Sequence, residues 1–217
     1  RKMQQRPRAW TRGGVRWEVA AAWPGAAELS RRLSLSPLIA QVLHNRGLDQ
    51  AERASRFLSP QLTDLHPPEL LHDADPAAAR LCRALADEQS ICLYGDYDVD
   101  GMAGVAILYR CLAMHAGRVE YYVPHRLEEG YGVNLEAVEK IAAAGTQLLV
   151  TVDCGISADA PLRRACQLGM EVIVTDHHAP TEVLPEALAI VHPGLGAYPN
   201  PDLSGACLLY TSDAADE

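Results

Sequence analysis

Three short apolar runs that each end in a cluster of polar, mostly acidic residues dominate the second half of this chain. The clusters are Asp96-Tyr97-Asp98-Val99-Asp100-Gly101, then Asp153-Cys154-Gly155, then Asp176-His177-His178. The runs before them have the β-branched, turn-bounded composition of buried strands, and helix-like segments alternate with them. Strands that alternate with helices form a parallel sheet through right-handed crossovers, and helices cover both of its faces. We therefore expect the three clusters to meet at the carboxyl edge of one sheet, where open α/β sheets bind ligands.

The predicted fold class is α/β, a parallel sheet with helices on both faces, preceded by a small helical N-terminal region. The strands are expected at 90–95, 118–123, 147–152, 171–175 and 189–191, and the helices between them at 101–116, 134–144 and 157–168. Gly101 and Gly155 would let the backbone turn sharply at the sheet edge.

Four segments are expected along the chain. Residues 1–23 form a basic lead-in that is extended or partly ordered, 24–89 the helical region, 90–206 the α/β domain, and 207–217 a foreign or truncated tail. The helical region should hold helices near 37–45, 49–57 and 75–87, the first opened by the cap and first-turn pair Ser36-Pro37.

Length and composition set broad limits. A chain of 217 residues that is 48% hydrophobic can bury a full core. It has no apolar run near the roughly 18 residues that span a bilayer and no apolar signal segment, so we expect a cytoplasmic protein with no membrane partner. Its six cysteines form no C-x-x-C pair, and most are expected to be small buried thiols.

The net charge of −9 does not exclude a nucleic-acid partner, because the charge is unevenly distributed. Residues 1–89 carry 13 basic and 10 acidic side chains (+3), whereas residues 90–217 carry 6 and 18 (−12). Bound cations would offset part of the acidic excess.

The spacing D-x-D-x-D points alternate side chains the same way, so Asp98 and Asp100, with Asp96 as a weaker candidate, can reach a shared ion. The alternative is that these acids cap the following helix, which would explain one of them but not three in five residues.

Asp153 follows an apolar strand, where an ionised carboxylate is unfavourable unless it is paired. A carboxylate there can bridge two metal ions about 3.5–4 Å apart, an arrangement suited to in-line attack on phosphorus. Capping of the next helix is the alternative. Cys154 is expected to be a packed residue rather than a ligand.

His177 and His178 are neighbours and must point differently, so one of them is expected to bind metal, and Asp176 could orient a ligating imidazole. Several carboxylates with one imidazole favour Mn²⁺ or Mg²⁺ over a structural Zn²⁺ site, which would use thiolates. A metal-dependent phosphoesterase is the function that this set of residues predicts.

The motifs GDYDVDG (95–101), VDCG (152–155) and TDHH (175–178) resemble motifs I to III of the DHH phosphoesterase superfamily. Within it, the segments PLIAQVLHNRG (37–47), ASRFLSPQLTDLHPPELL (54–71), YYVPHRLEEGYGVN (121–134) and LPEALAIVHP (184–193) resemble the RecJ family of bacterial single-stranded-DNA exonucleases.

This resemblance implies that Asp98, Asp100, Asp153 and His177 bind metal, with two ions in the complete enzyme, and that His178 lies near the scissile phosphate. Asp96 matches the first acid of motif I. Arg126 and Tyr131 lie in a loop expected to contact substrate: an arginine supplies a planar donor fork for phosphate, and a tyrosine can stack on a base or bond a phosphate. A packed turn aromatic is the alternative for Tyr131.

The implied function is 5′-to-3′ exonuclease action on single-stranded DNA in DNA repair and recombination, with a single-stranded-DNA-binding protein and a helicase as candidate partners. The alternatives are a phosphodiesterase acting on short RNA or cyclic dinucleotides, and a non-catalytic RecJ-like DNA-binding protein. After Ala206 the chain departs from the family: we expect it to lack the apolar helix after Gly205 and the aspartate of a fourth metal motif, and therefore to be inactive or nearly so by itself.

Overall fold

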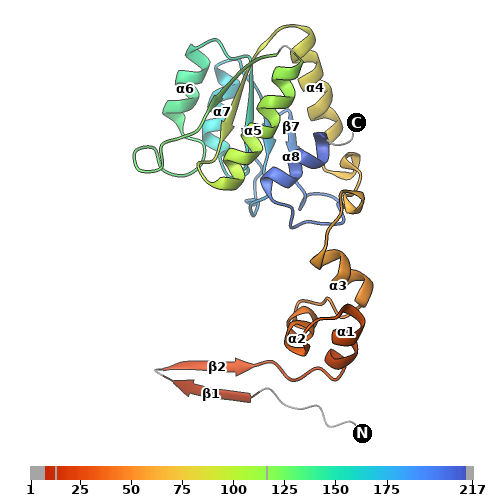
Figure 1. Cartoon of the computed structure of the whole chain (residues 1–217). Helices are drawn as coiled ribbons and strands as arrows, with labels where there is room; N and C mark the ends of the chain where they lie inside the picture. Colours follow the sequence, from red (N-terminus) through yellow and green to blue (C-terminus); the bar gives the residue numbers. More distant parts are fainter. Residues whose placement is uncertain (1–7, 13, 116, 214–217) are drawn as a thin grey trace. The chain divides into compact units, whose positions relative to one another are not determined.

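The structure, a computed structural model, describes residues 8–12, 14–115 and 117–213. The chain forms two compact units that divide between Leu65 and His66 (Figure 1). No helix among the described residues is both long and apolar enough to cross a membrane.

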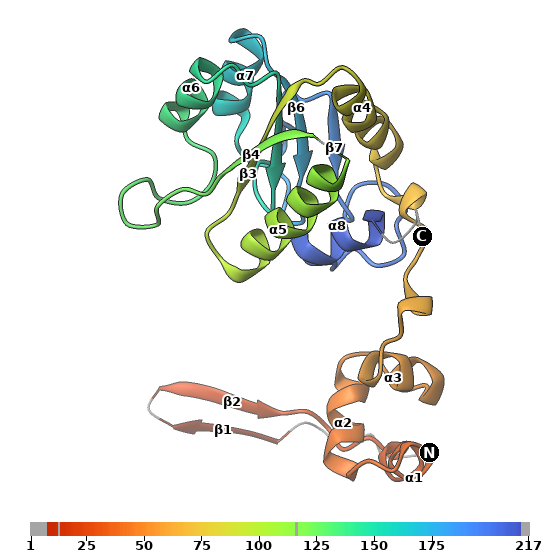
Figure 2. The ribbon, with the colours of Figure 1, turned by 45° about the horizontal axis from the view of Figure 1, so that its top comes forward.

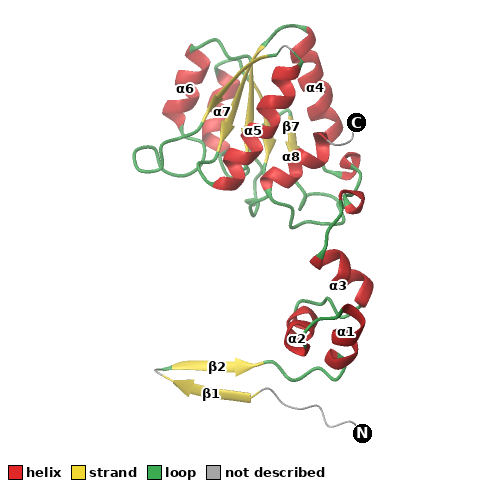
Figure 3. Cartoon of the chain, viewed as in Figure 1, coloured by secondary structure: helices red, strands yellow, loops and turns green. Residues whose placement is uncertain are grey.

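The first unit contains a two-stranded antiparallel sheet and a group of three helices (Figure 3). Its elements are β1 (Arg8–Arg12), β2 (Val15–Val19), α1 (Ala26–Leu33), α2 (Pro37–Asn45), α3 (Ala51–Leu58) and the 3₁₀ turn η1 (Leu62–Asp64). Helix α2 begins as predicted, with the Ser36 side chain accepting a hydrogen bond from Ile39 N and Pro37 in the first turn. The helices share a core of small and branched apolar side chains: Leu29, Ala40, Leu43, Ala51 and Ala54.

The hairpin of β1 and β2 differs from the extended or partly ordered lead-in that we expected for residues 1–23. Its register pairs Trp10 with Trp17. Gly14 has a φ of 77°, in the left-handed region that a tight hairpin turn uses and that glycine adopts without strain. The glycine pair at 13–14 was the sequence signal for this turn.

The second unit is a five-stranded parallel sheet with the strand order β4-β3-β5-β6-β7. Its strands are β3 (Ser90–Gly95), β4 (Arg118–Tyr122), β5 (Leu148–Val152), β6 (Glu171–Thr175) and β7 (Ala189–Val191). Its helices are α4 (Ala74–Ala86), α5 (Val99–Met114), α6 (Leu135–Ala143), α7 (Asp159–Gln167) and α8 (Gly205–Asp213), with the 3₁₀ turn η2 (Pro68–Leu70) before them. The predicted α/β class is confirmed.

Both faces of this sheet are covered, as predicted. Alternate residues of each strand point to opposite faces. Ile91 and Leu93 of β3 belong to the core that includes side chains of α4, α5 and α8, whereas Cys92 and Tyr94 belong to the core under α6 and α7. Figure 2 shows α5 and α8 on the near side of the sheet. Burial on both sides explains why β3, β5 and β6 are largely apolar instead of alternating, whereas the edge strand β4 (RVEYY) is mostly exposed.

Helix α4 packs with the sheet rather than with the N-terminal helices, which differs from the expected helical region 24–89. Ala77 and Ala84 of α4 are buried in the core beneath α5. The structural boundary therefore falls after Leu65, and α4 is a covering helix of the sheet. Its pattern resembled that of the preceding helices because any helix that covers a core has one apolar face.

Our expectation that the helix after Gly205 is missing is wrong. Helix α8 begins at that residue, and Leu208 and Leu209 are 0% and 8% exposed in the same core as α4 and α5. We expected the chain to depart from the family pattern after Ala206, but its two consecutive leucines fill the core as an apolar helix would.

We predict that Leu208→Ala lowers the free energy of unfolding of the second unit by about 2–5 kcal/mol, because it leaves a cavity beneath α8. Leu127→Ala, at a leucine that is 89% exposed, is the matched control and should change stability by less than about 0.5 kcal/mol. Urea unfolding followed by circular dichroism measures the change. All three tryptophans precede residue 24, so fluorescence follows the first unit separately. Equal effects of the two leucine variants would show that α8 does not pack as described.

Candidate metal centre

The site lies where the order of the sheet reverses. Strand β3 has the edge strand β4 on one side and the central strand β5 on the other. The chain leaves β3 through α5 to reach β4, then returns through α6 to β5, and these two helices cover opposite faces. The loops after β3 and β5 therefore diverge, which opens a crevice at the carboxyl ends of the strands. Asp96, Asp98 and Asp100 follow β3, and Asp153 follows β5.

The first two acids of the β3 loop differ in environment. Asp96 is 2% exposed, accepts a hydrogen bond from Tyr97 N at 2.7 Å, and has a pKa raised by burial. Asp98 is exposed and caps α5, because its Oδ1 accepts from Gly101 N at 2.9 Å. A Cβ at Gly101 would lie 2.6 Å from the Asp96 carbonyl oxygen, so glycine is required for this tight turn. Capping therefore accounts for one acid of the three, as the alternative interpretation allowed.

Asp100 lies in the first turn of α5 and connects the start of that helix to α8. Its Oδ2 accepts from Gly205 N and its Oδ1 from Ala206 N, both at 2.8 Å. An anion at a helix N-terminus satisfies free N–H groups and interacts favourably with the helix dipole. Asp100 Oδ2 also lies 3.5 Å from His177 Nε2, so the residue borders the crevice. Each carboxylate oxygen has a second lone pair, and its role as a ligand stays a prediction.

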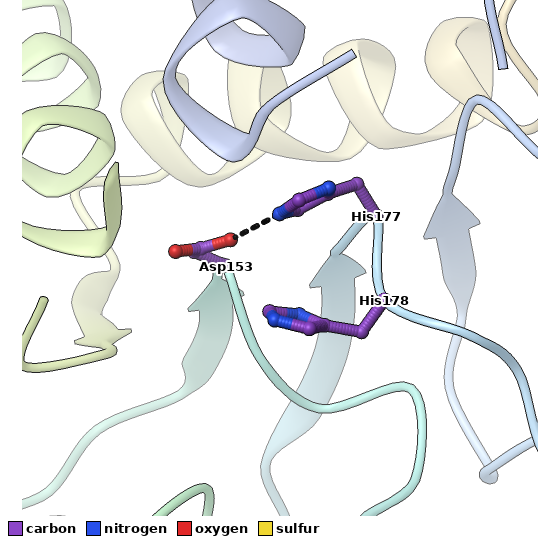
Figure 4. Close-up of side chains that lie close together, drawn as sticks. All are labelled: Asp153, His177 and His178. Atoms are coloured by element: carbon purple, nitrogen blue, oxygen red, sulfur yellow. Dashed lines mark ion pairs between the residues drawn. The ribbon is translucent and has the colours of Figure 1, made fainter. Parts of the chain in front are cut away.

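Asp153 is the most constrained residue of the site. It is 1% exposed, and neither of its carboxylate oxygens accepts a hydrogen bond from any described residue. Burial raises its pKa to about 7, and the charges of Asp100 and Asp98 add to the shift. Its Oδ1 lies 3.1 Å from His177 Nε2 (Figure 4). A buried carboxylate without hydrogen bonds is unfavourable unless a cation is placed against it.

The backbone at Asp153 is also unusual, with a φ of 61° in the left-handed region. Aspartate tolerates that region better than most residues. Asp153 N still donates to Thr175 O at 2.9 Å, so the conformation changes just where the sheet ends. A Cβ at Gly205 would lie 2.7 Å from Asp153 Oδ1, so glycine is needed at the start of α8 as well.

Asp176 orients His178 rather than His177. Its Oδ1 accepts from His177 N, His178 N and His178 Nδ1 at 2.7, 3.0 and 2.8 Å, and its Oδ2 accepts from Ile156 N at 2.9 Å. Burial of His178 opposes protonation, but the hydrogen bond to Asp176 and the charges of Asp176, Asp153 and Asp96 together outweigh it and raise the pKa of the imidazole. Because Nδ1 is engaged, Nε2 is the nitrogen of His178 that is left for the crevice. The imidazole of His177 forms no hydrogen bond with Asp176 and points its Nε2 at Asp153 (Figure 4).

Two groups of ligand atoms are close enough to hold an ion. Asp96, Asp98 and Asp153 form one, and Asp153, His177 and His178 form the other, with the ligand atoms of each group within 4.8 Å of one another. Asp153 belongs to both, which is the arrangement expected of a bridging carboxylate. The structure thus brings together residues from three strand ends that the sequence separates by about 80 positions.

The chemistry of the donors fits Mn²⁺ or Mg²⁺. The groups contain carboxylates and imidazoles and no thiolate. Cys154 is buried, its Sγ lies 3.6 Å from Tyr94 O, and burial raises the pKa of its thiol. The structure therefore agrees with our expectation that Cys154 is a packed residue.

Arg126 and Tyr131, the predicted substrate residues, come from the loop between β4 and α6. The Tyr131 hydroxyl is 3.3 Å from His178 Nε2, and its ring meets that imidazole edge to face. Arg126 is exposed, with its guanidinium carbon 5.2 Å from the centre of the Tyr97 ring. The loop therefore reaches the crevice, and Tyr97 is a contact that sequence reasoning missed.

His192 is a second residue that sequence reasoning missed. It is 2% exposed, donates from Nε2 to His178 O at 2.8 Å, and accepts from Gly194 N through Nδ1 at 2.9 Å. His192 therefore holds the backbone of His178, and Asp176 holds the imidazole ring of His178. The only sequence signal was its place in the family-like segment 184–193.

Comparison with known proteins identifies the family. The DHH family, N-terminal domain, matches residues 90–212, which cover the whole sheet and most of α8. The chain belongs to the DHH family. Among curated DHH relatives, the single-stranded-DNA-specific exonuclease RecJ of Bacillus subtilis is 37% identical over 194 residues, and that of Thermus thermophilus 42% identical over 197.

Solved DHH structures agree. RecJ of Thermus thermophilus in complex with Mn²⁺ matches 87% of this chain and 26% of its own with a TM-score of 0.65 and 34% identity. An exonuclease RecJ bound to manganese matches 66% of this chain and 37% of its own with a TM-score of 0.60 and 44% identity. The match to each of the two curated relatives covers 88% of this chain but only 25% and 27% of the relative. The chain therefore spans about a quarter of their length.

We predict that Asp153→Asn has opposite effects without and with metal. In EDTA the variant should be about 1–3 kcal/mol more stable than the parent, because it removes a buried carboxylate that accepts no hydrogen bond and asparagine tolerates the same backbone. With Mn²⁺ at about 100 times the parent's dissociation constant, the parent should gain about 2.7 kcal/mol and the variant little.

Urea unfolding followed by circular dichroism in EDTA and in Mn²⁺ measures both effects. Asp87→Asn, at an exposed aspartate that ends α4, is the control and should leave the Mn²⁺ gain intact. A parent that gains no stability from Mn²⁺ would exclude the metal centre.

Proposed function

We propose that this chain carries the catalytic centre of a metal-dependent phosphodiesterase that removes nucleotides from the 5′ end of single-stranded DNA. The observation that supports it most is Asp153, a buried carboxylate without hydrogen bonds that belongs to both ligand groups. Membership of the DHH family and the names of its curated relatives supply the substrate class. The finer expectations are part of the same proposal: a role in repair and recombination, a single-stranded-DNA-binding protein and a helicase as partners, and the cytoplasm as the place of action.

Different residues of the crevice have different roles in this proposal: metal binding, phosphate contact and positioning. The metal ligands are Asp96, Asp98, Asp153 and His177, with Asp100 at the edge of the crevice. They hold Mn²⁺ or Mg²⁺, which when bound supplies Lewis acidity for attack of water on phosphorus. His178 turns its Nε2, which lies 3.3 Å from the Tyr131 hydroxyl, toward the crevice, where it can contact a phosphate oxygen near the scissile bond. Asp176 and His192 keep that imidazole and its backbone in place.

Substrate contact comes from the loop between β4 and α6. Arg126 forms no ion pair with any described residue, so its guanidinium remains available to a phosphate, which it can bind through two parallel N–H groups. Tyr131 is 55% exposed beside His178 and offers a ring for stacking. Strand ends, metal ligands and phosphate contacts thus lie around one crevice.

The two alternatives fit less of the molecule. A non-catalytic DNA-binding protein would not need a buried carboxylate that accepts no hydrogen bond and belongs to two ligand groups. An enzyme for short RNA or cyclic dinucleotides would use the same ligand groups, but the segments that resemble RecJ, 37–47 and 54–71, lie outside the catalytic domain that all these enzymes share. The substrate therefore has to be tested directly.

A product assay tests the function. Single-stranded DNA labelled at its 5′ end, single-stranded RNA and cyclic dinucleotides are each incubated with Mn²⁺ and with the 217-residue chain or a version that continues past Ala206 as RecJ proteins do. We expect the longer version to release mononucleotides from the DNA, Asp153→Ala in it to abolish release with the fold unchanged, and the 217-residue chain to be inactive or nearly so. Preference for either of the other substrates would replace the proposed one.

We predict that Arg126→Ala weakens binding of single-stranded DNA about 10- to 100-fold, because one charge-assisted phosphate contact contributes about 1.5–3 kcal/mol. Its Mn²⁺ affinity should be unchanged, because Arg126 lies in the loop and not in a ligand group. Fluorescence anisotropy with a phosphorothioate strand at fixed salt measures the DNA affinity. Arg118→Ala, at the opposite end of β4, is the control, and an equal loss in the two variants would remove Arg126 from the site.

A further inference from the structure

Tyr97 lies inside the acidic motif but has none of its chemistry. It stands between Asp96 and Asp98, both members of one ligand group. Its backbone N–H donates to Asp96 Oδ1 at 2.7 Å. No described residue forms a hydrogen bond with its hydroxyl, so what Tyr97 contributes comes from its ring.

That ring contacts both substrate residues of the β4–α6 loop. The guanidinium carbon of Arg126 is 5.2 Å from the ring centre, and the Tyr131 ring meets it edge to face with centroids 6.2 Å apart and planes 80° apart. A cation over an aromatic face and an edge-to-face pair are both attractive arrangements. One side chain of the β3 loop therefore meets two side chains that lie about 30 residues further along.

The loop has few other attachments at this level. Figure 2 shows it extending away from the sheet between β4 and α6. At its base, Tyr94 Oη donates to Gly132 O at 3.0 Å, and Tyr122 forms a hydrogen bond with Glu129. These contacts hold the ends of the loop but not the Arg126 guanidinium. That group has no ion pair among the described residues, and the ring of Tyr97 is its aromatic support.

We propose that Tyr97 is a positioning residue that holds Arg126 and Tyr131 over the metal centre. A contact through the ring face uses no N–H donor of the guanidinium, so the fork stays free for a phosphate while its position is fixed. The same ring orients Tyr131, whose hydroxyl faces His178. Tyr97 thus sets the distance between the group that binds phosphate and the acids that bind metal. Its consequence for substrate binding rests on the proposed function.

Three variants of the 217-residue chain test the proposal. Tyr97→Phe keeps the ring, Tyr97→Leu removes it, and Tyr121→Leu removes an exposed tyrosine ring on β4, outside the crevice, as the matched control. Hydrogen exchange of the amides of residues 125–132 reports the loop directly and does not depend on any substrate. We expect exchange there to be about tenfold faster in Tyr97→Leu and unchanged in the other two, with the sheet amides unchanged throughout.

Affinity for a phosphorothioate single strand is the second measurement. Tyr97→Leu should weaken it about 3- to 10-fold, through loss of one cation–π contact and one aromatic pair. In the Arg126→Ala background the same change should have little further effect, because the group it positions is gone. Tyr97→Phe should bind like the parent, and Mn²⁺ affinity should be equal in all variants.

Each contrary result has a distinct meaning. Unchanged loop exchange in Tyr97→Leu, or losses of DNA affinity that simply multiply in the double variant, would overturn the positioning role. A drop in Mn²⁺ affinity would overturn it too, because Tyr97 would then act through Asp96 and Asp98. If the parent itself binds no single-stranded DNA, the proposed function fails, and loop exchange alone decides the role of Tyr97.

Discussion

The buried carboxylate of Asp153 is the constraint on which this site depends. It sits at the end of a central strand with a left-handed backbone and 1% exposure, and no described residue donates a hydrogen bond to it. Such a group destabilises the folded chain unless a cation compensates, so metal binding and folding become linked. Glycine is required at 205 because a side chain there would collide with the carboxylate. The fold therefore keeps an unfavourable element at the point where the two ligand groups meet.

Helix α8 closes the same site from the other end of the chain. Both oxygens of Asp100 accept hydrogen bonds from its first residues, and Leu208 anchors it in the core. Asp100 thus links the first turn of α5 to a helix more than 100 residues later, while its Oδ2 still lies 3.5 Å from His177 Nε2. If Asp100 also binds metal, the ion and α8 share a ligand, and the order of the helix would depend on the ion. Capping and metal binding, which we treated as alternatives, are compatible at this residue.

The sequence predicted the second unit well because its signals are local. Strands 90–95, 171–175 and 189–191 agree with the structure residue for residue, since continuous apolar runs bounded by turns have few other interpretations. The convergence of the acidic clusters followed from parallel topology alone. The sequence did not predict the contacts between side chains and distant elements: the pairing of Asp100 with α8, the packing of α4 on the sheet, and the contact of the Tyr97 ring with Arg126. It also did not show that Asp176 orients His178 and not His177. No spacing within one segment encodes a partner 30 or 100 residues away. The hairpin of β1 and β2 was missed for a different reason. Its signal, the glycine pair at 13–14, was present in the sequence, but we did not interpret it as a turn.

Charge adds a role for the metal beyond ligation. Counted by structural unit, residues 1–65 carry 11 basic and 5 acidic side chains (+6), and residues 66–217 carry 8 and 23 (−15). The acidic unit would repel a polyanion, and the repulsion is strongest at the crevice, where Asp96, Asp98, Asp100, Asp153 and Asp176 gather. Two divalent ions would reduce the charge of that unit to −11 and would offset four of the five carboxylate charges at the crevice. Arg126 is one basic group at the crevice and cannot do this alone. Binding of metal and binding of a polyanion should therefore be coupled through the electrostatic field at the crevice, in addition to any bond between an ion and a phosphate.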